Sequence, residues 1–260
     1  MAPVASPLAA REVRGWLAEL VGPERLGPDD RSLSDLGWDS LTLAETVMAA
    51  EADFGSVLPD ELVAELRTLG DVVHYVVVTA DRRSDRPGPD DGGALVPVTA
   101  ADEPMLFDWY TAPGSLQRFR LRGITPSPEH FHRLLWDGVL SQFLVCRHDG
   151  VAAGLVSCFE PDHRNRFAHL AALTNPEVPG ATTVPRALAE FITYLFRSFE
   201  LRKLYAHMLE GAYAQVASGA GRLFRCEGRL VDHEYVEGRY EDLVLLAVHR
   251  DDWCRSRHWR

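Results

Sequence analysis

The chain has 260 residues, of which 46% are hydrophobic and 25% are charged, and its formal net charge is -11. This composition is typical of a globular protein and excludes collagen-like and intrinsically disordered chains. No apolar run reaches the roughly 20 residues of a membrane span. No secretory signal opens the chain, and its four cysteines form no CxxC pair. We therefore expect a cytoplasmic protein without membrane contact or disulfide framework.

The negative charge is concentrated in the first third of the chain. Residues 1–80 hold 14 Asp and Glu against 5 Arg, whereas residues 81–260 hold 24 acidic and 22 basic residues. An acidic surface of this kind repels phosphate backbones and favours partners that present Arg or Lys. We expect no nucleic-acid partner.

A linker is predicted between two domains. Residues 81–95 read DRRSDRPGPDDGGAL, which combines proline, glycine and charge with almost no apolar residue. Such a segment is typical of a flexible linker and spans roughly 20 Å. The predicted organisation is a first domain over residues 1–80, the linker, and a second domain over residues 96–260.

The first domain has the pattern of an all-α bundle. Apolar residues recur at helical spacing over residues 8–21 and again from Ser40 onward. Asp60 can cap a short helical turn, and Leu69–Thr79 supplies a last helix. These elements predict four helices, with one long loop over residues 22–39.

Two motifs give the first domain a family resemblance. The string Leu36-Gly37-Trp38-Asp39-Ser40-Leu41 opens the second predicted helix, and Leu69-Gly70-Asp71-Val72-Val73 opens the last one. Together with the acidic bundle, they resemble an acyl or peptidyl carrier protein over residues 8–80. The resemblance implies that a phosphopantetheinyl transferase attaches a 4'-phosphopantetheine arm to Ser40, beside Asp39. The arm's thiol would then hold an acyl group as a thioester.

The helix start supports this role for Ser40 but also offers a simpler one. Backbone N–H groups and the helix dipole at such a position favour an anion, here the phosphodiester of the arm. Asp39 or Ser40 can equally serve only as the N-cap of the helix. Both interpretations are open at this point.

The second domain changes from helices to strands. An Asp-Gly turn predicts a β-hairpin, and later segments alternate between helical and strand patterns. This order predicts an α/β (α+β) domain with a mixed sheet and helices on its faces. The predicted elements are strands at Gln142–Arg147, Val151–Phe159, Phe167–Thr174 and Lys203–Leu209, helices at Val184–Phe199 and Tyr213–Phe224, and a terminal pair of strands ending near Val248.

A series of short motifs gives the second domain its own resemblance. The motifs are Thr174-Asn175-Pro176, Arg186-Ala187-Leu188, Leu201-Arg202-Lys203-Leu204-Tyr205, Cys226-Glu227-Gly228-Arg229-Leu230 and Glu237-Gly238-Arg239-Tyr240-Glu241-Asp242. In this order they are similar to a GNAT-family acyltransferase over residues 96–255. The resemblance implies a splayed sheet, in which Phe167–Thr174 and Lys203–Leu209 run parallel, diverge and admit the pantetheine arm of the acyl donor.

The phosphate-binding loop implied by this family is altered. Its R/Q-x-x-G-x-G/A positions fall on Gly180, Thr183 and Pro185, directly before Arg186. Proline lacks an N–H, and Thr183 adds a side chain where close approach needs none. Either the loop is re-registered around Gly180 and still binds acyl-CoA, or the carrier arm replaces free CoA as donor. Gly180, Thr183 and Arg186 are the predicted cofactor-binding residues.

The resemblance also places the general base. Its position on the strand before the loop is His169, and a histidine with an ordinary pKa near 6.5 can accept a proton from an ammonium group. His207, on the neighbouring strand, is the second catalytic candidate. Each histidine can also be an ordinary structural residue. The asparagine and tyrosine often found further along in the family have no counterpart, since Gly211-Ala212 and Gly219 lie there.

Other polar residues have weaker signals. Glu160 lies in a polar turn and is a minor candidate for substrate contact. His130 and His132 are two residues apart on a presumed helix, so they point to different faces and predict no metal site. The cysteines are expected to be small core residues.

The leading hypothesis is a carrier/GNAT enzyme of polyketide or nonribosomal peptide biosynthesis. It would transfer an acyl group between a thioester, on Ser40 or on CoA, and a small amine acceptor, together with acyl-loading or downstream biosynthetic enzymes. One alternative is a decarboxylase or loading protein that acts on a malonyl-type thioester. Another is a carrier protein whose GNAT-like domain only docks partners. The acyl group, the acceptor and the oligomeric state are open.

Overall fold

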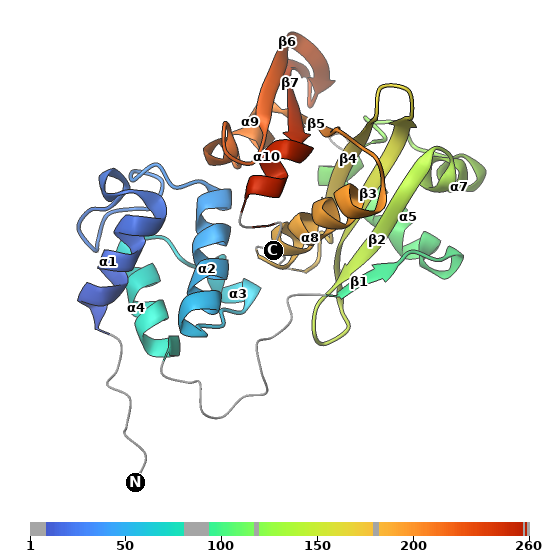
Figure 1. Ribbon diagram of the computed structural model, residues 1–260. Coiled ribbons are helices and arrows are strands. Elements are labelled where there is room, and N and C mark those ends of the chain that lie inside the picture. The colour runs from blue at the N-terminus through green and yellow to red at the C-terminus, as the bar shows by residue number, and fades with distance from the viewer. Residues whose placement is uncertain (1–8, 81–93, 117–119, 179–181, 257, 259–260) are drawn as a thin grey trace. The chain divides into compact units, whose positions relative to one another are not determined.

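The chain folds into two compact units (Figure 1). The computed structural model describes residues 9–80, 94–116, 120–178, 182–256 and 258. The first unit comprises Met1–Asp91 and Gln215–Ser218, and the second comprises Gly92–Ala214 and Gly219–Arg260. Most of the predicted linker lies outside the described residues. None of the helices within these ranges combines the length and apolarity needed to cross a membrane.

The first unit confirms the predicted helical bundle. Apolar residues on the inner faces of the helices form its core, and they include Val13 and Leu17, which are fully buried. Gly70 is required where the long loop meets the last helix, because a Cβ there would lie 2.8 Å from the Asp29 carbonyl oxygen. The helices of this unit in the described part of the chain are α1 (Ala10–Val21), α2 (Ser40–Phe54), α3 (Asp60–Val63) and α4 (Leu69–Ala80).

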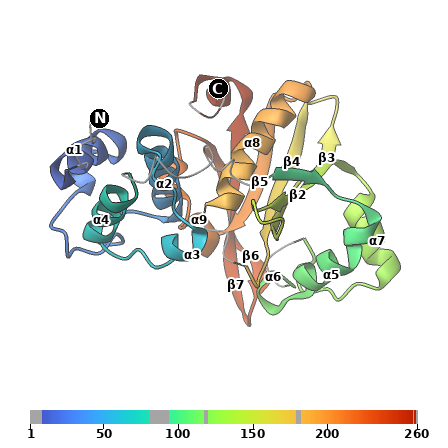
Figure 2. The ribbon, with the colours of Figure 1, turned by 90° about the horizontal axis from the view of Figure 1, so that it is seen from below.

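The second unit is built on one mixed sheet (Figure 2). Over the described residues the sheet has seven strands in the order β1-β2-β3-β4-β5-β7-β6. β4 and β5 pair in parallel, whereas every other neighbouring pair is antiparallel. The strands are β1 (Ala94–Pro97), β2 (Val139–Cys146), β3 (Ala152–Asp162), β4 (Phe167–Thr174), β5 (Lys203–Leu209), β6 (Arg225–Val236) and β7 (Arg239–His249).

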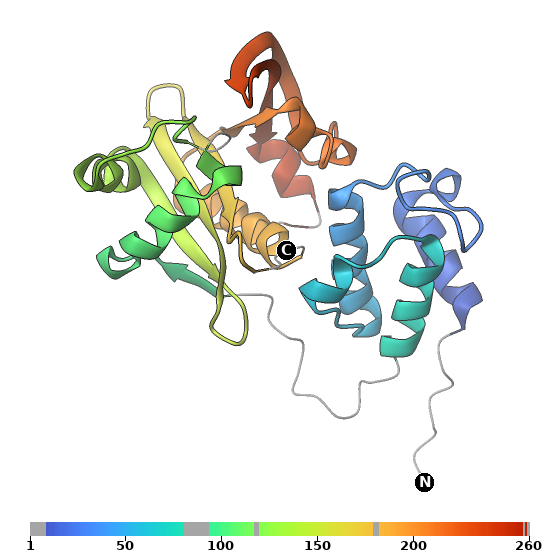
Figure 3. The same cartoon turned by 180° about the vertical axis from the view of Figure 1, so that it is seen from behind.

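Helices cover both faces of the sheet (Figure 3). The long helix α8 buries an apolar stripe, centred on Phe191 and Leu195, against one face. On the other face, α5 and α7 pack against the apolar ends of β2, β3 and β4. The helices of this unit are α5 (Glu103–Thr111), α6 (Pro113–Leu116), α7 (Pro128–Trp136), α8 (Thr183–Ser198), α9 (Glu210–Tyr213) and α10 (Arg250–Arg255).

Three parts of the sequence-based prediction are wrong. Asp60, expected to cap the short helix α3, is instead its first residue, and Pro59 is at the N-cap. The helix expected over Tyr213–Phe224 is instead the last residue of α9, a 3-10 turn at Ala217–Gly219 and a loop. Gly221 has a left-handed φ of 76°, which ends any helical path there. At the predicted linker, Ala94 and Leu95 belong to β1 and pair with β2.

Candidate carrier and acyl-transfer sites

Ser40 lies at the start of α2, immediately after the residue that caps the helix. The Asp39 carboxylate accepts hydrogen bonds from the backbone N–H and the hydroxyl of Thr42, both at 2.8 Å. Asp39 is therefore the N-cap, and the alternative in which Ser40 caps the helix is wrong. The Ser40 side chain is exposed at the positive end of a 15-residue helix. This position suits a phosphodiester, so the residues present fit a phosphopantetheine arm.

Trp38 holds the loop that leads to Ser40. Its indole N–H donates to the Arg25 carbonyl at 2.9 Å, and its backbone N–H donates to the Leu33 carbonyl at 2.9 Å. The side chain is only 6% exposed. The tryptophan therefore anchors the segment before α2 in the core of the first unit.

In the second unit, β4 and β5 diverge as the family resemblance implies. Their paired register joins Phe167 to Lys203, Ala168 to Leu204 and His169 to Tyr205. Both strands then continue, but the pairing ends at His169 and Tyr205. Beyond that point the facing strand edges can accept an extended chain.

Both predicted catalytic histidines lie where the strands diverge. The rings of Phe159, His169 and Tyr205 form a row across β3, β4 and β5. Ring centroids in this row are 5.9 Å apart, with planes tilted by 28° and 30°. The His207 ring meets the His169 ring edge-on, with centroids 5.1 Å apart. The structure thus brings His169 and His207 into direct contact.

The surroundings favour the neutral form of both histidines. Burial lowers the pKa of His169 below its usual range, and the Glu160 carboxylate opposes this effect. The His207 ring remains exposed, yet partial desolvation lowers its pKa, and the charges of His169 and Arg122 act in the same direction. A neutral imidazole at pH 7 can accept a proton from an ammonium group.

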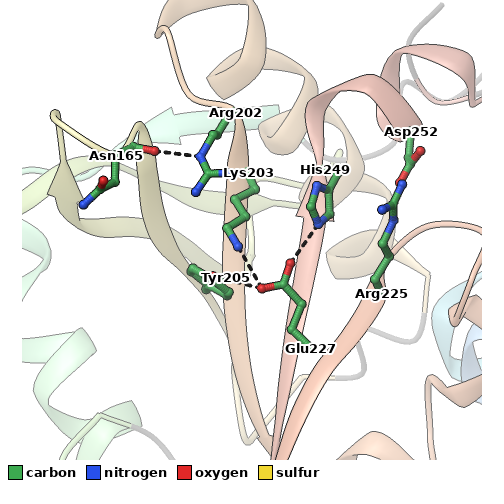
Figure 4. A network of polar contacts seen from close by, with 8 residues as sticks. All are labelled: Asn165, Arg202, Lys203, Tyr205, Arg225, Glu227, His249 and Asp252. Carbon is green, nitrogen blue, oxygen red and sulfur yellow. Dashed lines mark hydrogen bonds and ion pairs between the residues drawn. The ribbon is translucent and has the colours of Figure 1, made fainter.

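A polar network fixes the third ring of the row (Figure 4). Glu227 Oε2 accepts hydrogen bonds from Lys203 Nζ at 2.8 Å and from the Tyr205 hydroxyl at 2.9 Å. His249 Nε2 lies 2.9 Å from Glu227 Oε1. The Lys203 hydrogen bond is the largest of the causes that lower the pKa of Glu227 to about 2. The ionised carboxylate therefore holds Tyr205 beside His169.

Several of these residues were missed by the sequence analysis. The alternation of Lys203, Tyr205 and His207 along β5 places all three on one face, and this signal was present in the sequence. An ion pair between Arg122 and Glu234, with a distance of 2.7 Å, had no such signal. It joins a loop to a strand that lies far away in the sequence.

The first turn of α8 contains the altered phosphate loop. Thr183, Val184 and Pro185 occupy the first three helical positions, so the third offers no N–H. The backbone N–H of Arg186 already donates to the Thr182 carbonyl at 3.0 Å. Thr183 and Arg186 are thus placed in the predicted turn, whereas Gly180 lies outside the described residues.

Gly154 allows α8 to start close to the diverging strands. A Cβ at this position would lie 2.6 Å from the Leu173 carbonyl oxygen and 2.9 Å from Val184 Cγ2. Only glycine therefore lets the first turn of α8 approach the end of β4 this closely. The turn lies where the family resemblance places the phosphate groups of the donor.

The remaining candidates have other surroundings. His132 Nδ1 lies 3.0 Å from a Glu103 carboxylate oxygen. Among the residues that the structure describes, no group of three or more His, Cys, Asp or Glu could hold a metal ion. Burial raises the pKa of the Cys158 thiol to about 12, so this thiol is unreactive.

Comparisons with known proteins define both units. Residues 11–76 match the family described as "Phosphopantetheine attachment site", and residues 94–216 match the "Acetyltransferase (GNAT) domain" family. The second unit resembles the spermidine N-acetyltransferase of Vibrio cholerae in its complex with CoA and spermine. That likeness has a TM-score of 0.56 and 18% identity, and it covers 63% of this chain and 99% of the other. At this identity it shows the fold alone.

The first unit has closer relatives. It is 33% identical over 98 residues to the meromycolate extension acyl carrier protein of Mycolicibacterium smegmatis, which covers 35% of this chain and 94% of that protein. It is also 43% identical over 56 residues to the acyl carrier protein of Wolinella succinogenes, covering 22% and 74% respectively. The chain therefore belongs to the acyl carrier protein family through its first unit. To this carrier it joins a GNAT acyltransferase domain.

Proposed function

We propose that the second unit transfers an acyl group from an arm on Ser40 to a small amine. The observation that carries this proposal is the contact between His169 and His207 where β4 and β5 diverge. A GNAT fold with proton acceptors at that point is suited to aminolysis of a thioester. The exposed Ser40, in the same chain, provides an attachment site for the thioester.

The chemistry assigns a role to each part of the site. When attached, the arm supplies a thiol that holds the acyl group as a thioester. His169 accepts a proton from the ammonium form of the acceptor and so exposes its nitrogen lone pair. The nitrogen attacks the acyl carbonyl carbon, a C–N bond forms, and the C–S bond breaks. The amine nitrogen loses a second proton, and the leaving sulfur takes up this proton and departs as a thiol. Backbone N–H groups of the diverging strands can stabilise negative charge on the carbonyl oxygen.

The first turn of α8 supports a carrier-borne donor. Pro185 removes one of the backbone donors that would face a pyrophosphate. An arm on a carrier has a single phosphodiester and no nucleotide, so the missing backbone donor weakens its binding less than that of CoA. We therefore expect Thr183 and Arg186 to contact the phosphate of the arm, with free acyl-CoA as a weaker donor.

The biological setting follows from the carrier. A phosphopantetheinyl transferase must modify Ser40, an acyl-loading enzyme must supply the thioester, and downstream enzymes must use the acylated amine. Polyketide or nonribosomal peptide biosynthesis combines these reactions, and we assign the protein to such a pathway.

Mass spectrometry of the intact protein tests this function. The full chain is first converted to the holo form with a phosphopantetheinyl transferase, loaded with an acetyl group and mixed with amines. We expect loss of the acetyl group from the protein and an acetylated amine in solution. Ser40→Ala is the control and should gain no arm. A holo protein that keeps its acetyl group with every amine, or that releases CO2 from a malonyl group instead, would contradict the proposal.

A further inference from the structure

Arg120 lies at one end of the ring row, and among the described residues no carboxylate forms an ion pair with it. Its guanidinium carbon is 4.2 Å from the centroid of the Phe159 ring, and Phe159 is the neighbour of His169 in the row. Arg120 also lies beside the buried Tyr110 hydroxyl. Its Nη1 is buried, and within the described parts of the chain this atom has no hydrogen-bond partner.

Unlike Arg120, the other cations around the site are paired with carboxylates. Lys203, at the opposite end of the row, is 7% exposed and pairs with Glu227 at 2.8 Å. Arg122 pairs with Glu234 at 2.7 Å. A guanidinium that is half-buried without a compensating charge is unfavourable, so Arg120 calls for an anion that the described residues do not supply.

Two further buried polar atoms lie beside the ring row. Ser157 is fully buried, and in the described part of the chain neither its Oγ nor Gln142 Oε1 has a hydrogen-bond partner. Ser157 pairs in register with Gln142 on one side and with Ala171 on the other, two residues beyond His169. Buried polar atoms are rarely left unsatisfied in proteins. Because side chains alternate along a strand, Ser157 lies on the same face of the sheet as Phe159.

We infer that Arg120 binds a carboxylate of the acceptor, so that the acceptor is an amino acid rather than a simple amine or polyamine. This inference rests on the proposed function. A guanidinium forms two parallel hydrogen bonds with a carboxylate, which fixes orientation as well as affinity. With its carboxylate at Arg120, an amino acid would present its amine one ring further along the row, at His169. Ser157 Oγ and Gln142 Oε1 would form hydrogen bonds with polar atoms of the bound amino acid.

Ornithine and putrescine test the inference directly, because they differ only in one carboxylate. The holo protein with an acetyl group on Ser40 is mixed with each amine, and the acetylated product is quantified. We expect kcat/KM to be at least tenfold higher for ornithine. Arg120→Gln should lower kcat/KM for ornithine by tenfold to hundredfold, mainly through KM, because a hydrogen bond to a charged group is lost. Its kcat/KM with putrescine should fall by much less than its kcat/KM with ornithine, because putrescine has no carboxylate for Arg120 to bind.

Two variants control for effects on the fold. Arg120→Lys keeps the charge and should recover part of the ornithine activity. Arg166→Gln removes an exposed arginine that pairs with Glu200, and it should leave both activities unchanged. Urea unfolding of each variant separates a binding defect from loss of structure.

Four other results would overturn the inference. Equal use of both amines, or an equal loss of both in Arg120→Gln, would mean that Arg120 only supports Tyr110 and Phe159. Release of CO2 from a malonyl-loaded arm that depends on Arg120 would place the carboxylate on the acyl group. Transfer to neither amine would overturn the proposed function itself, and this inference with it.

Discussion

The chemistry proposed for the second unit depends on two histidines, and the charge of each depends on where its ring lies. His169 is half-buried between Phe159 and Tyr205, and His207 contacts it edge-on. Because burial lowers the pKa of both, they stay neutral below the pH at which a free histidine is protonated. A neutral base is the form that the proposed transfer requires.

Replacement of His169 should therefore affect chemistry more than stability. His169→Ala is expected to lower kcat by about 100-fold or more, since the acceptor loses its general base. In the wild type, the midpoint of the fall in kcat at acid pH should lie below 6.5, the ordinary pKa of a histidine, because burial lowers the pKa of His169. Stopped-flow acyl transfer from pH 5 to 8 measures both effects. The exposed turn residue His148 gives the matched control, His148→Ala. Equal rates in His169→Ala and the control would remove His169 from the mechanism.

Glu227 makes a different contribution, because it neutralises the buried Lys203. Glu227→Gln should lower the free energy of unfolding by about 1–3 kcal/mol at pH 7. The pKa of Glu227 falls from 4.5 to about 2 on folding, so this stabilisation is present above pH 4.5. It should disappear as pH falls towards 2. Urea unfolding of both proteins across this range measures the difference. Glu200→Gln, at an exposed ion pair, should change stability by less than about 1 kcal/mol.

The sequence-based prediction agrees best with the structure at the diverging strands and α8. β4 and β5 have their predicted bounds, because polar or turn residues flank each apolar run. His169 and His207 were found through the family resemblance to this pair of strands. The helix expected after Tyr213 does not form, since Gly219 and Gly221 override the apolar pattern there.

The residues that sequence reasoning missed are those that depend on tertiary contact. Arg120 meets Phe159, and Glu227 meets Lys203, only after distant segments pack on the sheet. No local periodicity predicts such pairs. The sequence therefore predicts the histidines of the candidate site on the strands, but not the charged residues that surround them.

Pro185 gives the first turn of α8 its own prediction. Pro185→Ala restores a backbone N–H and should strengthen binding of acetyl-CoA by about tenfold, as one hydrogen bond to a charged group is gained. Calorimetric titration of the full chain with acetyl-CoA measures the change. Pro128→Ala, at the first position of α7, is the matched control and should bind acetyl-CoA like the wild type. An unchanged affinity in Pro185→Ala would mean that phosphate is bound elsewhere.

The whole molecule combines a carrier and a catalyst in one chain. A tethered donor reaches its catalyst at an effective concentration in the millimolar range when the linker matches the span. Such a tether compensates for weak binding of the free donor. The composition of residues 81–95 predicts this kind of linker.

Limited proteolysis tests the predicted organisation. We expect the first cuts between Asp81 and Leu95, followed by two stable fragments, because each unit has its own hydrophobic core. The products are identified by mass spectrometry. First cuts within the carrier helices or the sheet, with residues 81–95 intact, would contradict two independently folded units.

The second unit is proposed to remove an acyl group from the arm of its own chain. This proposal is tested most directly by the rate at which acetyl-loaded holo protein loses its acetyl group to ornithine, followed by quenched-flow mass spectrometry. We expect a first-order loss whose rate constant is independent of protein concentration and falls about 100-fold or more in His169→Ala. An acetyl group that stays on Ser40, or that leaves equally fast in His169→Ala, would contradict it.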